Sequence, residues 1–516
     1  MRSLEEALLL GHGPGTSSRF GSGDITSWND RASSLSATRR KAPLKQGRAN
    51  PVSTPAEWGS LRGDLRRPLP PHPTRTRRAR RPGPEILSAA FLALALTSWA
   101  AFADETEAPA SSSTQEAAAE SPRRVYWDDG LRFRLFQKPP LTEEGPAVPS
   151  DEAFWITGKV NARLQVDSDN YVTSDGLEHI GSGWEVRRLR IGVGGEIHGL
   201  GDPSYSMNFE LAGVNPQWSD TYLLWQGLPW IGSLKVGNFK PPFSLEALTS
   251  SRDVTFMEDG SPVQAFAPGF RIGAAIGTPV WDGRVTWSLG LFTAVQTQDV
   301  GDTTRDAGRV AARVTWLLLR DVAARRFVHV GLDVTAVESQ DSLKYRSRPE
   351  SHLAPYLLDT GTLHVGGAEL VDLEAAWVEG PFSLQSELLH SFVDEPGGSL
   401  LNFGGAYVYA SWFLTGECRP YDSSQGIFGP VTPLESFSLR GHGWGALEVG
   451  TRLSYLDLTS ASVRGGVIHG VTGDLTWYLS RHWKTKFEYG FEMIRSAAGG
   501  NNGNLQFFQL RFQVDY

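Results

Sequence analysis

Cysteine, methionine and lysine are scarce in this chain. Its 516 residues include one Cys and four Met, and only nine of the 49 basic residues are Lys. One cysteine cannot form an intrachain disulfide, which excludes a disulfide scaffold. Only one apolar run approaches the ~20 residues of a membrane helix, which excludes a polytopic helical membrane protein. Aromatic residues make up 11% of the chain, which argues against wholesale disorder.

Motifs for catalysis are also missing. The chain has no Gly-x-Ser-x-Gly elbow, no His-Glu-x-x-His pair and no Walker loop. We therefore predict no enzyme, no cofactor and no metal site, with an outward-facing Ser/His hydrolase as the alternative. Asp167, Asp169, Asp175 and Glu178 do not match EF-hand spacing and are predicted to form a solvated loop. Cys418 is interpreted as incidental.

The first hundred residues differ in charge from the rest. Residues 1–103 hold 16 Lys and Arg and 7 Asp and Glu, whereas the remainder holds 33 and 50. A basic cluster at 75–81 precedes an apolar stretch that ends Ala101-Phe102-Ala103 before an acidic pair. This order is typical of a cleavable secretory signal, with cleavage after Ala103; a single membrane anchor is the alternative.

These features predict four regions. Residues 1–74 are interpreted as a disordered upstream extension from a misassigned start, and 75–103 as the signal peptide. Residues 104–150 are expected to form a periplasmic leader, with a short hairpin in the alternating part of 122–150. Residues 151–516 form the remaining domain. Because the basic head lies outside the mature chain, nucleic-acid binding is not expected.

The last domain alternates apolar and polar residues with a period of two. In the segment Phe154–Asp167, Ile156, Val160 and Leu164 share one face, while Lys159, Asn161 and Arg163 share the other. Sixteen such segments can be placed, near 154–166, 185–197, 205–212, 219–227, 233–240, 271–279, 284–292, 308–318, 327–336, 367–378, 382–390, 405–414, 444–456, 467–479, 482–494 and 505–516.

Two architectures share this alternation. A soluble β-sandwich turns the apolar face inward, whereas a transmembrane barrel turns it outward. Long charged residues recur on the polar faces, and aromatic residues lie near strand ends, which favours the barrel. We predict an all-β, 16-stranded antiparallel transmembrane β-barrel with long outer loops. The final strand alternates perfectly and ends on Tyr516, resembling the signal that bacterial outer-membrane assembly machinery reads.

Several stretches together resemble the phosphate-selective porin O and P family. They appear in order over about 150–516: Arg187-Arg188-Leu189-Arg190-Ile191-Gly192, Val236-Gly237-Asn238-Phe239-Lys240-Pro241-Pro242-Phe243-Ser244-Leu245-Glu246, Leu248-Thr249-Ser250-Ser251, Phe256-Met257-Glu258, Arg346-Ser347-Arg348-Pro349-Glu350, Asp359-Thr360-Gly361, Gly380-Pro381-Phe382-Ser383-Leu384-Gln385 and Gly443-Trp444-Gly445-Ala446. The resemblance implies a trimeric channel in the outer membrane of a Gram-negative-type bacterium that takes up phosphate or polyphosphate. Two departures from the family pattern weaken the substrate inference: Asp259-Gly260 stands where basic residues are expected, and Phe270 precedes Arg271 where a second arginine is expected.

Anion selectivity requires fixed positive charge in a narrow lumen, and arginine meets phosphate oxygens with two parallel bonds. The polar faces, the family motif and the loop after the 233–240 strand supply the candidates: Lys159, Arg163, Arg187, Arg188, Arg190, Lys235, Lys240, Arg252, Arg271, Arg309 and Arg313. Arg187 has the opposite parity from Arg190, which places it at a bulge or at the aromatic girdle. The proline-rich stretch 241–270 is predicted to fold into the barrel and narrow it; a surface lid is the alternative.

Three functions stay open at this point. The first is a passive, anion-preferring porin with inorganic anions such as phosphate as solutes. The second is a general or cation-tolerant porin on the same scaffold, favoured if each lumen arginine is matched by an acid. The third is a structural protein that anchors the envelope, favoured if the lumen is plugged.

Overall fold

The structure is a computed structural model of the chain. It describes residues 125–128, 130–135, 154–213, 215–293, 308–338, 343–396, 400–495 and 502–516. The predicted upstream extension, the signal segment and the cleavage point at Ala103 lie outside the described residues. No helix among the described residues is long and apolar enough to cross a membrane.

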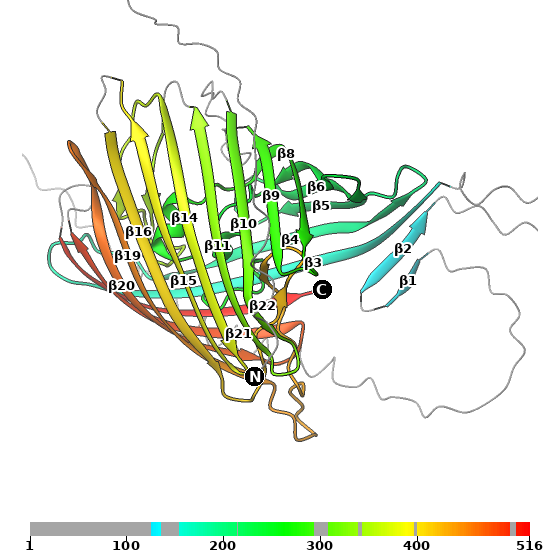
Figure 1. Cartoon of the computed structure of the whole chain (residues 1–516). Coiled ribbons are helices and arrows are strands. Elements are labelled where there is room, and N and C mark those ends of the chain that lie inside the picture. The colour runs from blue at the N-terminus through cyan, green and yellow to red at the C-terminus, as the bar shows by residue number, and fades with distance from the viewer. Residues whose placement is uncertain are drawn as a thin grey trace, which may run out of the picture. The chain divides into compact units, whose positions relative to one another are not determined.

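Sixteen antiparallel strands form a closed barrel, as predicted (Figure 1). Each strand of the barrel pairs with the strand that follows it in the sequence, and the last strand, β22, pairs with the first, β3, which closes the cylinder. The strands are β3 (Trp155–Thr173), β4 (Gly183–His198), β5 (Ser204–Glu210), β6 (Gln217–Leu228), β7 (Gly232–Phe239), β8 (Arg271–Val280), β9 (Val285–Phe292), β10 (Gly308–Asp321), β11 (Arg326–Glu338), β14 (Gly367–Glu379), β15 (Phe382–Asp394), β16 (Leu400–Phe413), β19 (Ala446–Ser460), β20 (Val463–Tyr478), β21 (Trp483–Arg495) and β22 (Gly503–Asp515).

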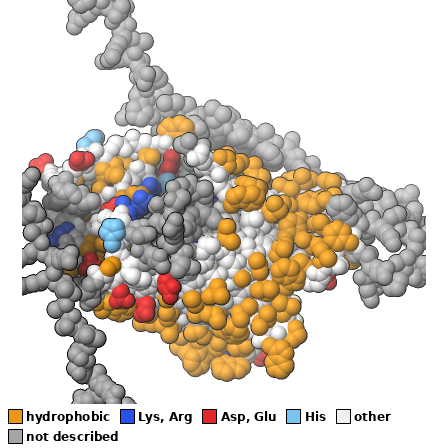
Figure 2. All heavy atoms as spheres, turned by 90° about the horizontal axis from the view of Figure 1, so that it is seen from above, with side chains coloured by type: hydrophobic (Ala, Val, Ile, Leu, Met, Phe, Trp, Pro, Cys, Tyr) orange, Lys and Arg blue, Asp and Glu red, His pale blue; other side chains and the backbone are white. Residues whose placement is uncertain are grey.

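Each strand turns its apolar face outward. Leu373 and Leu388 lie opposite each other in the β14–β15 register and are 49% and 52% exposed, whereas the next pair, Glu374 and Glu387, is buried in the lumen. Orange apolar side chains cover much of the visible outer surface in Figure 2. Large exposed tryptophans gather near the short turns, as in an aromatic girdle: Trp230, Trp281, Trp377 and Trp412. The alternation therefore encodes a barrel with a polar interior.

Strand β3 is longer than the sequence predicted. The predicted solvated loop is wrong for Asp167 and Asp169, because β3 continues to Thr173 and both carboxylates are buried in the lumen. Asp167 accepts two hydrogen bonds from Arg511 of β22, the strand that closes the barrel on β3. Asp167 and Asp169, two residues apart on β3, thus belong to its lumenal face.

Three connections fold into the barrel. Residues 240–270, between β7 and β8, fold inward as predicted, and they carry two short helices that were not predicted, α2 (Leu245–Leu248) and α3 (Ser261–Phe266). Residues 343–366, the described part of the β11–β14 connection, carry β12 (Arg346–Ser347) and β13 (Leu358–Asp359). Their apolar side chains, among them Phe256, Phe266 and Tyr345, form a buried core with the lumenal wall.

Only the first of these inward connections was predicted; the second and the third were not. Residues 414–445, between β16 and β19, carry β17 (Tyr421–Asp422) and β18 (Ile427–Phe428). Connections alternate between the two ends of an antiparallel barrel, so this segment enters from the end that carries the short turns, opposite the other two. Its Phe428 packs with Leu245 and Val378 inside the lumen.

A short hairpin precedes the barrel. β1 (Val125–Trp127) pairs with β2 (Leu131–Leu135), and β2 pairs with Ile156–Lys159 of β3. β22 pairs with the later part of β3, from Arg163 to Thr173, so the hairpin continues the sheet beyond the end of β22. The hairpin therefore covers an edge of β3 that β22 leaves unpaired.

Candidate functional site

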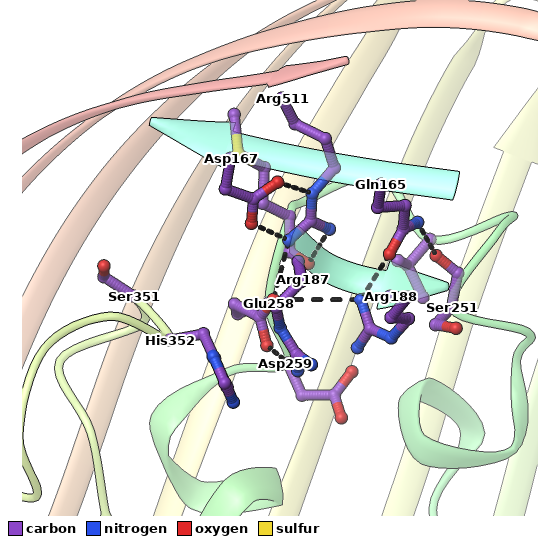
Figure 3. A network of polar contacts seen from close by, with 12 residues as sticks. Gln165, Asp167, Arg187, Arg188, Ser251, Glu258, Asp259, Ser351, His352 and Arg511 are labelled. Carbon is purple, nitrogen blue, oxygen red and sulfur yellow. Dashed lines mark hydrogen bonds and ion pairs between the residues drawn. The ribbon is translucent and has the colours of Figure 1, made fainter. Parts of the chain in front are cut away.

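Loop 240–270 crosses the lumen and is held there by Glu258. Both oxygens of this carboxylate accept hydrogen bonds from Arg187 at 2.8 Å, and Oε1 also accepts one from Arg511 Nη2 at 2.8 Å. Arg188 lies 3.9 Å away (Figure 3). One loop carboxylate thus receives guanidinium groups from two strands that are far apart in sequence, β4 and β22.

A bulge in β4 places Arg187 in this cluster. Gln165 of β3 pairs with Arg188, but Val166 pairs with Val186, so Arg187 is the extra residue. The bulge turns two consecutive arginines toward the lumen, which plain alternation forbids. Of the two placements predicted for Arg187, the bulge is the one observed.

The charges of this cluster fix its protonation state. Burial alone would raise the pKa of Glu258, but the guanidinium groups of Arg187 and Arg188 hold it well below 4.5. For the next residue, Asp259, burial raises the pKa, and Lys240 opposes that rise only in part. The constriction therefore keeps a fixed negative charge at Glu258, in contact with the guanidinium groups of Arg187, Arg188 and Arg511.

Two arginines outside the predicted set tether the loops as well. Arg452 is fully buried and donates to Glu350 of the second loop at 2.6 and 3.1 Å, and to Glu246 of the first at 3.3 Å. Arg511 joins Asp167 and Glu258. Both lie on the polar face of alternating strands, so parity could have found them, but their loop partners cannot be read from a strand pattern.

The predicted cations have several kinds of partner. Arg163 pairs with Asp515 at 2.9 Å, and Arg190 pairs with Glu210 at 2.8 Å. Arg188 donates to the neutral Gln165 amide oxygen at 2.7 Å. The others have these contacts: Lys235 over the rings of Tyr222 and Phe239, Lys240 on the Ala247 carbonyl, Arg252 beside Asp253, and Arg309 on Thr335. Arg271 is buried at the start of β8.

Arg313 lies on the opposite side of the barrel from this cluster, on β10. It pairs with Glu374 at 2.8 Å and donates to the Gly426 carbonyl, also at 2.8 Å. It therefore fixes the segment 414–445 against the wall. Its neighbourhood is acidic, so it does not join the other predicted cations.

Four of the predicted pore-lining cations lie around one cavity of about 400 Å³. Lys159, Arg163, Arg190 and Arg252 line it, and the sequence did not predict Arg481, which lines it too. Its acidic side chains are Asp220 and Asp515. The cavity lies between the β3–β6 wall, loop 240–270 and the segment 414–445, whose Pro430 and Thr432 complete it.

The lining of this cavity carries more basic than acidic side chains. Five basic side chains face two acidic ones across a confined space, and Ser250 and Asn208 add neutral polar groups. In a narrow, partly desolvated lumen such an excess lowers the free energy of an anion and raises that of a cation. Arginine in particular offers phosphate a paired donor geometry.

Comparison with known proteins relates the barrel to a family. Residues 159–516 match the family model described as "phosphate-selective porin O and P". Porin O of Pseudomonas aeruginosa is 26% identical over 316 residues, which cover 53% of this chain and 68% of that protein. An uncharacterized protein of Caulobacter vibrioides is 27% identical over 399 residues, 75% of each chain.

Solved structures with a similar arrangement include the anion-selective porin from Comamonas acidovorans. It covers 70% of this chain and 100% of its own at 13% identity, with a TM-score of 0.43. The outer membrane channel DcaP of Acinetobacter baumannii covers 70% and 97% at 10% identity, with the same TM-score of 0.43.

Proposed function

Because the chain belongs to the phosphate-selective porin O and P family and is an outer-membrane porin, we propose that it forms a passive channel that prefers small inorganic anions, including phosphate. The observation that carries this proposal is the cavity with five basic and two acidic side chains beside the constriction loop. A solute that crosses the lumen along β3–β6 meets this cavity. The proposal includes no catalytic step.

A general porin is the second candidate, and one observation favours it. Arg163, Arg187 and Arg190 each pair with a carboxylate, which lowers the charge that a permeating anion meets. Asp259 also lies in the constriction, next to Glu258. The anion-preferring function is better supported because Arg188 hydrogen-bonds the neutral Gln165 and shares Glu258, at 3.9 Å, with two other arginines, and because the cavity keeps an excess of basic groups.

The test replaces Arg188 and Arg190 together by Ser and measures the reversal potential in a KCl gradient. At about 8 Å in water a unit charge contributes about 0.5 kcal/mol, with opposite signs for anion and cation. Loss of two such charges changes the free-energy difference between anion and cation by about 2 kcal/mol, so we expect the double variant to lower the anion-to-cation permeability ratio roughly thirtyfold. Arg320→Gln, which changes an exposed arginine near a short turn, is the control and leaves the ratio unchanged. A double variant with wild-type selectivity would show that these two arginines do not set the filter.

We also propose that the chain assembles as a homotrimer. The subunits would meet at the side of the barrel where the strands are shortest, from β5 to β9, which we call the low side. β5, β7 and β9 have only 7 to 8 residues, whereas β10 to β22 have 13 to 16 among the barrel strands. Apolar side chains on the low side are exposed, including Trp218, Ile272 and Leu291. Crosslinking of the folded protein in detergent tests this, and a monomer-only pattern contradicts it.

A further inference from the structure

The wall opposite the cationic cavity carries two like-charged pairs in direct register. Asp333 of β11 lies opposite Asp372 of β14, and Glu374 of β14 lies opposite Glu387 of β15. Like charges directly opposite each other destabilise a sheet. All four side chains face the lumen and are at most 3% exposed, so water does not screen them.

The four carboxylates differ in the number of hydrogen-bond donors and basic groups that contact them. Arg313 contacts Glu374 at 2.8 Å and Asp333 at 3.5 Å. The backbone N–H groups of Ser244 and Glu246, at α2, donate to Asp333 and Glu387.

Neither carboxylate oxygen of Asp372 accepts a hydrogen bond from an N–H group or a basic side chain of the described residues; both are buried, and the group beside them is the Glu387 carboxyl. One oxygen of Glu387 is in the same condition, and Asp333 Oδ1 has only the Arg313 guanidinium group, at 3.5 Å. Four carboxylates thus share one guanidinium group, and Asp372 contributes a fully buried carboxylate that no basic group contacts. A buried ionised carboxylate is costly unless a cation or a proton compensates it.

The geometry suits a metal ion. One oxygen from each of Asp333, Asp372 and Glu374 can be chosen so that all three lie within 4.8 Å of one another. We propose that these three carboxylates bind a divalent cation, with Ca²⁺ as the preferred ion, and that Glu387 supports the site from β15.

The ligand set decides the kind of cation. Carboxylate oxygens select hard cations, and His329, the nearest imidazole, already bonds Glu374 and the Tyr421 hydroxyl. Mg²⁺ keeps several waters and usually takes one or two carboxylates, whereas Ca²⁺ accepts many oxygens in flexible geometry. Three desolvated carboxylates therefore favour Ca²⁺.

This site goes beyond the proposed channel function. A bound Ca²⁺ offsets most of the excess negative charge of the β11–β15 wall. It also stabilises the carboxylates that hold α2 through Ser244 and Glu246, and with them the constriction loop.

The test measures metal bound to the folded full chain in detergent. The protein is stripped with EDTA, dialysed against Ca²⁺ and analysed by atomic absorption, with wild type compared to Asp372→Asn. We expect about one tight Ca²⁺ per wild-type chain and at least roughly tenfold weaker binding in the variant, since ligand charge sets the affinity. Glu492→Gln is the matched control: Glu492 is equally buried and unpartnered but lies outside the cluster, and its variant retains the ion.

Two results would overturn the proposal. Equal binding by wild type and Asp372→Asn would place the ion elsewhere. Absence of bound Ca²⁺ in wild type would mean that a proton held between Asp372 and Glu387 neutralises the cluster. If Asp372→Asn does not fold, the wild-type protein is titrated with Mn²⁺ and followed by electron paramagnetic resonance. Loss of the signal of free Mn²⁺ that Ca²⁺ reverses supports the site. An undiminished signal of free Mn²⁺ refutes it.

Discussion

Replacement of Glu258 by Gln isolates the contact that holds the constriction loop. The change keeps the shape of the side chain but removes the charge that Arg187, Arg188 and Arg511 surround. Arg511 keeps Asp167, with hydrogen bonds of 2.6 and 2.7 Å. Arg187 keeps no hydrogen-bonded carboxylate among the described residues, so its largely buried charge loses its one directly bonded partner, while Asp167 and Glu185 act on it only through space.

The size of the effect follows from this loss. Removal of one partner of a buried ion pair costs about 3–5 kcal/mol, and most of that cost falls on Arg187 here. We therefore expect the free energy of unfolding in lipid, measured by denaturant titration, to fall by about 3–5 kcal/mol in Glu258→Gln.

The control variant is Glu210→Gln. Glu210 also accepts two backbone hydrogen bonds, from Leu189 and Ala212, which the amide oxygen of Gln can keep, and its one arginine partner is Arg190. We expect a smaller loss there, about 1–2 kcal/mol. Equal losses in the two variants, or a loss below about 1 kcal/mol at Glu258, would refute the reasoning that Glu258 joins three guanidinium groups.

Two further predictions concern pH and the third inward segment. The folded-state pKa of Glu258 lies well below 4.5, so its stabilising effect is complete above that pH and is lost as pH falls through the folded value. The difference in unfolding free energy between wild type and Glu258→Gln is therefore constant from pH 7 to 4.5 and narrows below; narrowing already between pH 7 and 6 would contradict this. Replacement of residues 417–443 by a short turn removes the segment that closes the cavity, so we expect the single-channel conductance to rise several-fold. Unchanged conductance in a folded barrel would show that this segment does not narrow the ion path through the lumen.

The strands could be predicted from sequence because their signal is local. A period of two over ten residues fixes which face meets lipid, and all sixteen predicted segments correspond to observed strands. The prediction was wrong where a polar stretch could be either a loop or the lumenal face of a strand. Asp167 and Asp169 resemble a polar loop, but they continue the lumenal face of β3 and are compensated by Arg511 and other groups distant in sequence.

The site was less predictable than the fold. Parity identified lumenal cations, but the partner of each cation depends on loops and on strands far away in sequence, as with Glu258 and Arg187. The segment 414–445 has no sustained alternation to mark it. Its entry into the lumen follows only from the barrel order, which puts this connection at the end with the short turns. The parity conflict in the family motif Arg187-Arg188-Leu189-Arg190 indicated either a bulge or a girdle position, and the structure has the bulge.

The most direct test of the central claim is the reversal potential of the wild-type channel. Residues 104–516 are refolded into a planar bilayer, a KCl gradient is imposed, and phosphate is then added. The account predicts a potential of the sign that chloride permeation gives, and a chloride current that phosphate reduces. A potential of the opposite sign, from a channel shown to be folded and inserted, would contradict the anion preference and support the general porin instead.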